Sequence, residues 1–164
     1  MGAPRERVWE AILSQDLGAS PLAKSLLALR GYGGRALRAR GGTFPERLER
    51  FGFTKLDELP VSELVFGLAG KFWRLDGGLR PVPDRDAFLA FAEERCVKVA
   101  WNLLIGETDG ESCDLSTETR IAYFGPSARR RFRSYWFFIG PFSGLHRRAL
   151  LRGIARHAEA RRPG

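Results

Sequence analysis

A chain of 164 residues, 44% hydrophobic and 28% charged, has the composition of a globular protein and is long enough to form one domain over residues 1–164. Charged side chains crowd the first ten residues, and no apolar run approaches the length that crosses a bilayer, so we expect neither a secretory signal nor a membrane span. Two cysteines are too few for a disulfide framework or a zinc site, so we expect a cytoplasmic protein.

The net charge of +8 is unevenly distributed along the chain. Residues 126–164 carry ten arginines and one glutamate, a net charge of +9, whereas residues 1–125 carry 17 basic and 18 acidic side chains. This asymmetry indicates either an anionic partner, such as nucleic acid or a membrane surface, or a helix with a solvated basic face. Arginine outnumbers lysine 23 to 4 in the whole chain, so the C-terminal arginines partly follow a general bias.

The N-terminal part is predicted to be helical. Pro4 suits the first turn of a helix whose apolar stripe includes Val8 and Ile12. Ser20 and Pro21 open a second predicted helix, and residues 31–42 form a glycine-rich basic loop. This loop has neither the preceding strand nor the spacing of a phosphate-binding fingerprint, so we reject that interpretation.

Strands are predicted from Phe53 onward. The stretches 53–59 and 62–73 are rich in β-branched and aromatic residues, and Gly67 and Gly70 predict a bulge or a sharp bend in the second stretch. A loop over 74–83 and a short helix over 84–95, capped by Asp84, separate them from two long strands at 96–106 and 112–123.

A long helix is predicted over residues 126–160, with a kink at Gly140-Pro141. The order of elements predicts an α+β fold, in which an antiparallel sheet has its helices gathered on one side. The long helix is expected to cross the concave face of this sheet.

The last two strands form a hairpin with two alternative registers. A two-residue loop would pair Trp101 with Glu118 and mix charged with apolar groups on both faces. A three-residue loop, with Gly110 in the left-handed position, pairs Trp101 with Thr117 and separates the two classes of side chain. We predict the second register. It leaves Glu118 and Arg120 as an exposed charge pair, with Lys98 opposite Arg120, in preference to a catalytic dyad.

The sequence resembles a known superfamily over almost its whole length. The resemblance is carried, in this order, by "APRERVWEAI", "ELVFGLAGKFW", "VKVAWNLLI", "LSTETRI" and "ARRRFRSYWFFIGPFSGLHRRALLRGI". It is a resemblance to the SRPBCC, or START-like, superfamily, and more narrowly to its bacterial members of the polyketide cyclase/dehydrase-like type. It implies a helix-grip fold, in which a curved antiparallel sheet wraps a long C-terminal helix around a deep cavity. Superfamily members usually begin with a strand before the first helix, so we expect that strand to be missing here.

The resemblance also implies a ligand for the helix-facing side of the sheet, such as a lipid, a polyketide or a sterol. A cavity with an apolar wall and a few polar groups is the functional interpretation of the side chains there, and a solid core is the alternative. The candidate ligand-binding residues are Trp101, Thr117, Thr119, Tyr123, Tyr135 and Trp136.

No catalytic residue, metal ligand or cofactor site is predicted. His146 and His157 lie eleven residues apart on the long helix, about 16 Å, which is too far for one metal or one proton relay. Both are expected to be surface histidines, and Cys96 and Cys113 are expected to be buried, unreactive thiols. Glu118 is not assigned a chemical role.

Three functions follow from these observations. The first is the binding or carrying of a hydrophobic small molecule, and the second is an aromatase/cyclase-type enzyme on the same fold. The third is a basic surface that binds anionic lipid or nucleic acid. Aromatic residues stand among the nearly consecutive arginines of 129–133, which favours transient contact with an anionic membrane over sequence-specific binding of nucleic acid. The ligand and the oligomeric state stay open at this point.

Overall fold

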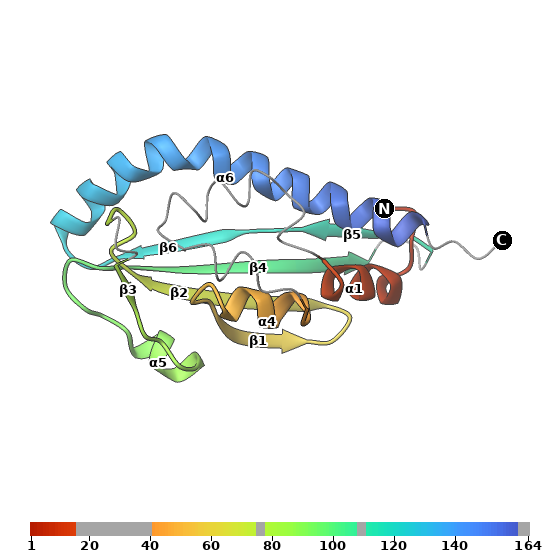
Figure 1. Cartoon of the computed structure of the whole chain (residues 1–164), viewed down its shortest axis with the longest axis horizontal. Coiled ribbons are helices and arrows are strands. Elements are labelled where there is room, and N and C mark those ends of the chain that lie inside the picture. Colours follow the sequence, from red (N-terminus) through yellow and green to blue (C-terminus); the bar gives the residue numbers. More distant parts are fainter. Residues whose placement is uncertain (16–40, 75–77, 108–110, 161–164) are drawn as a thin grey trace.

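A six-stranded antiparallel sheet, with a long C-terminal helix across one face, forms the framework of the molecule (Figure 1). The computed structural model describes residues 1–15, 41–74, 78–107 and 111–160. The predicted α+β class is confirmed. The described elements are α1 (Arg5–Leu13), α4 (Phe44–Glu49), β1 (Thr54–Leu59), β2 (Glu63–Gly70), β3 (Leu79–Arg80), α5 (Arg85–Ala90), β4 (Val97–Glu107), β5 (Cys113–Ser116), β6 (Thr119–Tyr123) and α6 (Pro126–Ala160).

The helix predicted from Ser20 and most of the basic loop lie outside the described residues. The described helices differ from prediction in two places. Helix α4 was not predicted, although Thr43 and Glu46 form a capping box at its start, in which the Thr43 amide donates to Glu46 Oε2 at 2.8 Å. Helix α5 ends at Ala90 and not at residue 95, and Lys98 Nζ caps its last turn by donating to the carbonyl oxygens of residues 88 and 89.

The sheet is built around the central pair β2 and β4. Strands β1 and β3 both pair with β2, and β5 and β6 both pair with β4. The bulge predicted in β2 is wrong in its position, because the register shifts in β1, between Lys55 and Asp57. Gly67 has a packing role, since a Cβ there would lie 2.7 Å from the Phe88 ring of α5. Gly70 has a φ of +149° and ends β2.

The predicted hairpin pairings are wrong by two residues. Trp101 pairs with Thr119, and Val99 pairs with Ile121. Five residues, and not three, therefore lie between Glu107 and Cys113, which are the last paired residues of β4 and β5. An even shift keeps every side chain on its predicted face, so the separation of apolar from polar residues is confirmed.

Between β5 and β6, the side chains of Asn102 in β4 and of Thr117 replace one backbone bond of the ladder with β4. The Glu118 amide donates to Asn102 Oδ1 at 2.8 Å, and the Thr117 hydroxyl donates to the Asn102 carbonyl oxygen at 2.7 Å. The predicted strand over 112–123 is consequently divided into β5 and β6.

Glu118 and Arg120 form the predicted exposed pair. Arg120 Nε donates to Glu118 Oε1 at 3.0 Å. The Arg120 side chain is 79% exposed and the Glu118 side chain is 58% exposed. The arginine lowers the pKa of the Glu118 carboxyl. The predicted place of Lys98 beside this pair is wrong, because Lys98 pairs with Ala122 and its ammonium group lies at the end of α5.

The core occupies both faces of the sheet. On the face crossed by α6, one cluster joins α1, α4 and the C-terminal half of α6 to the sheet, and a second joins the start of α6 to the other end. On the opposite face, Phe88 of α5 packs on Ala69 and Val82. The prediction that the helices gather on one side is therefore wrong for α5.

Met1 lies beside β5. Its ammonium group donates to the Cys113 carbonyl oxygen at 2.9 Å, and its carbonyl oxygen accepts from the Cys113 amide at 3.2 Å. The expectation of a missing first strand stays a prediction.

Candidate functional site

Helix α6 is anchored to the sheet near its two ends. At its start, Ala128 and Phe132 are buried with Leu68, Phe72 and Val97. In its C-terminal half, Leu150, Ile154 and Ala158 are buried against α1 and the sheet. Ile139 is buried, but no α6 side chain from Phe137 to Ala149 belongs to a hydrophobic cluster of the described residues, so about 20 Å of helix lies between the two clusters.

The helix is continuous through this span. Pro141 lies inside α6, and Figure 1 shows the helix arched over the sheet. A proline in a helix interior removes one hydrogen bond and bends the helix. The arch lifts the middle of α6 relative to its anchored ends.

Two polar side chains of this middle segment are partly buried. Arg147 Nη1 donates to Thr119 Oγ1 of β6 at 3.1 Å. His146 is half-buried, and its Nδ1 atom is buried without a hydrogen-bond partner. Burial lowers the pKa of His146 from its ordinary value of 6.5, so the imidazole is neutral at pH 7. The prediction that His146 is a surface histidine is wrong.

Sequence reasoning missed both of these residues as site candidates. His146 and Arg147 precede the buried Leu150 by four and three residues, which places all three on one helix face. That spacing was available in the sequence. The neighbouring Arg148, which is exposed, made the segment look like a solvated surface.

Trp101 and Thr117 form a fixed unit on the sheet. Trp101 Nε1 donates to Thr117 Oγ1 at 2.6 Å, although the two residues are not paired in the ladder. The Trp101 ring stacks on Phe66 with centroids 5.8 Å apart and meets Phe44 and Phe53 edge-on at 6.1 and 6.3 Å. The Thr117 hydroxyl donates its only proton to the Asn102 carbonyl oxygen. Trp101 and Thr117 therefore form a rigid wall, and neither has a free donor for a ligand.

Tyr123, Tyr135 and Trp136 gather around Phe132 instead. Their ring centroids lie 5.6, 5.7 and 5.6 Å from that of Phe132, and the Trp136 ring is stacked on it. Thr119 of β6 lies directly opposite Trp101 in the ladder, and Tyr123 lies four residues farther along the same strand. The six predicted ligand residues are therefore distributed along the helix–sheet junction.

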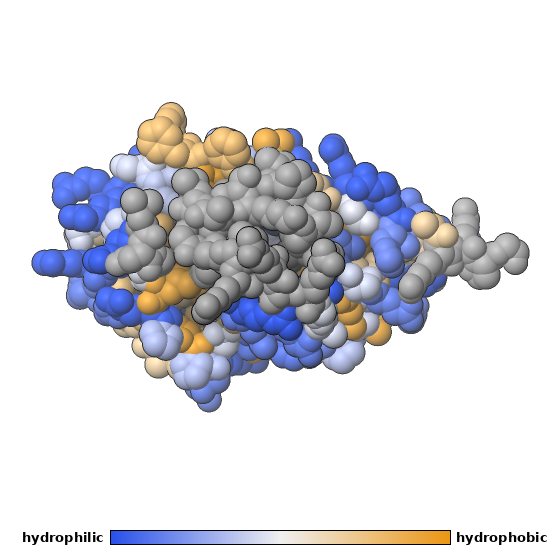
Figure 2. All heavy atoms as spheres, viewed as in Figure 1, coloured by the Kyte–Doolittle hydropathy of each residue, from blue (hydrophilic) through white to orange (hydrophobic). Residues whose placement is uncertain are grey.

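The outward side of α6 carries large apolar side chains. Phe137 is 77% exposed and Phe138 is 68% exposed, and the centroids of their rings lie 5.3 Å apart. Phe142 and Leu145 are each 51% exposed, so the apolar stripe continues for two further turns. Figure 2 shows hydrophobic side chains projecting from the upper edge, where Figure 1 places α6.

Three arginines flank this stripe. An open groove of about 1170 Å³ lies between the end of β6 and the first turns of α6. Its lining combines cationic with aromatic side chains: Tyr123, Gly125, Pro126, Arg129, Arg130, Arg133, Ser134, Phe137 and Phe138.

The two cysteines are buried free thiols, as predicted. Burial raises the pKa of both Cys96 and Cys113, which keeps the sulfur atoms protonated and poorly nucleophilic. Within the four described ranges, no helix is both long and apolar enough to cross a bilayer.

Comparison of the chain with protein-family models, curated proteins and solved structures gives no match. Membership of the SRPBCC superfamily therefore stays a prediction, and the functional argument depends on the side chains themselves.

Proposed function

We propose that the protein binds a hydrophobic small molecule with an anionic head between the middle of α6 and the sheet. The observation that carries the proposal is a pair of partly buried polar groups of this segment, the Arg147 guanidinium and the unpartnered Nδ1 atom of His146. Buried polar atoms are normally hydrogen-bonded, so an unpaired one is a place where a ligand atom is expected.

The surroundings suit an amphipathic molecule. Trp101 lies opposite Thr119 in the ladder, Tyr135 and Trp136 belong to the aromatic group around Phe132, and Arg147 supplies a cation that a carboxylate or a phosphate can approach. A sheet crossed on one face by a long C-terminal helix is also the layout that the SRPBCC resemblance implies. A lipid-, polyketide- or sterol-like ligand fits this chemistry when it carries an acidic group.

A fluorescent fatty acid tests this function. Titration with cis-parinaric acid should show saturable binding, because its emission rises in an apolar environment. Arg147→Gln should weaken binding about tenfold or more, the effect of one lost charged hydrogen bond. Arg148→Gln is the matched control, since it removes the same charge from the adjacent exposed position.

Equal affinities of the two variants, or no saturable binding by a folded protein, would count against the proposal. The melting temperature of each variant should be measured alongside, because a partly unfolded chain also binds fatty acids. Native mass spectrometry of the purified protein would identify a ligand that co-purifies.

A second candidate function is docking on an anionic membrane, and the exposed Phe137–Phe138 pair favours it. Monomeric proteins seldom expose several large apolar side chains together, and such patches mark interaction sites. Arg129, Arg130 and Arg133 line the same groove, and cations beside aromatic rings match the anionic headgroups and acyl boundary of a bilayer. Sedimentation with phosphatidylglycerol-containing vesicles tests this candidate, with release by added salt as the expected result.

A further inference from the structure

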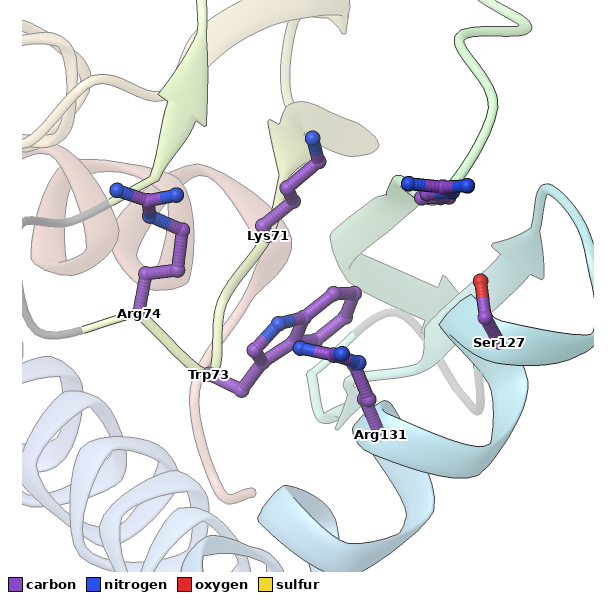
Figure 3. A pocket seen from close by; sticks show the side chains of 6 residues that line it. Lys71, Trp73, Arg74, Ser127 and Arg131 are labelled. Carbon is purple, nitrogen blue, oxygen red and sulfur yellow. The ribbon is translucent and has the colours of Figure 1, made fainter.

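A separate pocket of about 510 Å³ opens beside the first turns of α6 (Figure 3). Its lining comes from three parts of the chain, namely the turn after β2, the segment before β4 and the start of α6. In Figure 3 the Trp73 indole lies between Lys71 and Arg131, with Arg74 and Ser127 farther to either side. The lining residues are Lys71, Trp73, Arg74, Arg95, Ser127 and Arg131.

Four of the six described lining residues are cations, and none is a carboxylate. Of these cations, Lys71 forms an ion pair in the described part of the chain with Glu93, whose Oε1 lies 4.0 Å from Lys71 Nζ. Both Glu93 oxygens already accept from Arg80 Nε, at 3.0 and 2.8 Å. In the described part of the chain, no ion pair is formed by Arg95 or Arg131. Arg95 and Arg131 therefore give the pocket positive charge that a bound anion would neutralise.

The backbone holds these groups in place. Arg95 has a φ of +62°, an uncommon conformation for a non-glycine residue, and its amide donates to the Phe124 carbonyl oxygen at 2.9 Å. On the other wall, the first amides of α6, including that of Ser127, have no carbonyl partner within the helix. The Ser127 hydroxyl and the helix dipole add to the attraction for an anion there.

We propose that this pocket binds the phosphoryl group of a phosphate monoester, with the organic part of the ester against Trp73. A phosphoryl group has three terminal oxygens and up to two negative charges, so it can accept from several cations at once, and arginine forks fit it bidentately. The volume lies within the range of small-molecule sites and leaves space for more than the phosphoryl group alone. The indole offers a flat apolar surface for that remainder.

This site is separate from the one proposed beneath the middle of α6. None of its lining residues belongs to the group around Arg147, Thr119 and His146. Failure of fatty-acid binding would therefore not bear on the phosphate-monoester proposal. Failure of phenyl phosphate binding would not bear on the proposed fatty-acid site.

Calorimetric titration with phenyl phosphate tests the site in solution. Saturable 1:1 binding is expected, whereas phenol, which lacks the phosphoryl group, should not bind measurably. The double variant Arg95→Gln, Arg131→Gln should weaken phenyl phosphate binding about tenfold or more. The matched control Arg152→Gln, Arg156→Gln removes two exposed charges from the far end of α6 and should change affinity less than about twofold.

A parallel vesicle experiment distinguishes a soluble ester from a lipid headgroup. Phosphatidic acid carries a phosphate monoester and phosphatidylglycerol a diester, so the two are compared at matched surface charge in phosphatidylcholine vesicles. Preference for phosphatidic acid that is lost in Arg95→Gln, Arg131→Gln assigns the site to a lipid headgroup. Binding of phenyl phosphate without that preference assigns it to a soluble ester.

Three results would overturn the proposal. They are equal weakening by the pocket and control double variants, phenol binding as tightly as phenyl phosphate, and no saturable binding of any of these probes by the folded wild-type protein.

Discussion

The exposed aromatic pair on α6 permits a quantitative test of membrane docking. The double variant Phe137→Ser, Phe138→Ser removes two side chains that are 77% and 68% exposed. Complete burial of one phenylalanine contributes about 1.5–3 kcal/mol. Insertion of the exposed fractions of both rings therefore contributes about 2–4 kcal/mol, and the variant should bind vesicles about 30- to 1000-fold more weakly.

The same substitution should leave the fold intact. Surface substitutions away from special features usually change the free energy of unfolding by less than about 0.5 kcal/mol. Sedimentation with vesicles of phosphatidylcholine and phosphatidylglycerol gives the partition coefficient, and urea denaturation gives the stability. Leu89→Ser is the matched control, because Leu89 is 61% exposed and belongs to α5, which packs on the opposite face of the sheet.

Two results would refute this reasoning. An unchanged partition coefficient would show that the rings do not enter the bilayer. A loss of several kcal/mol in the free energy of unfolding would show that the two phenylalanine rings are buried in the free protein. That result would contradict the exposed positions from which the prediction starts.

Two further predictions concern stability. The pKa of His146 is lowered by burial, so the unfolded chain binds the proton more tightly, and stability should fall as the pH drops below about 6.5 toward the folded-state pKa. Urea midpoints should show this slope in the wild type and its loss in His146→Gln; parallel curves would contradict a buried neutral imidazole. Gly67→Ala places a methyl group 2.7 Å from the Phe88 ring and should cost about 1–3 kcal/mol, as overpacking does. Adding Phe88→Leu should recover part of that loss, and strict additivity of the two changes would contradict direct contact.

The hairpin shows how far the alternation of apolar and polar residues along a strand can predict the pairing register. Burial of one face fixes the parity of the pairing, which is why Trp101, Thr117 and Thr119 lie on the predicted side. It does not distinguish registers that differ by two residues, because both keep every side chain on its face. The observed register includes side-chain bonds from Asn102 and Thr117 that substitute for a ladder bond, and no pattern of hydrophobicity indicates such bonds.

The helices illustrate the effect of length. Helix α6 begins at Pro126 and ends at Ala160 as predicted, since a long periodic stretch with a proline start is a strong pattern. Helix α4 has six residues, too few for periodicity to appear, although its capping box from Thr43 to Glu46 was present in the sequence.

The candidate site was predicted less well than the fold, for a physical reason. Which side of α6 meets the sheet depends on where its buried anchors lie, and Leu150 and Phe132 fix that only after folding. His146 and Arg147 consequently looked like surface residues. Tyr135 and Trp136 were correctly placed on the sheet-facing side, but they meet Phe132 and not Trp101.

The arginines at the start of α6 do not form a single basic patch. At about 100° per residue, Arg131 lies about 160° around the helix from Arg133. Arg131 accordingly lines the pocket with Trp73, whereas Arg129, Arg130 and Arg133 line the aromatic groove. Neutralising the groove arginines should therefore reduce binding to anionic vesicles without changing the affinity for phenyl phosphate. If both proposals hold, one helix would separate two kinds of anion recognition, an open aromatic groove for headgroups and a concave pocket for a phosphoryl group.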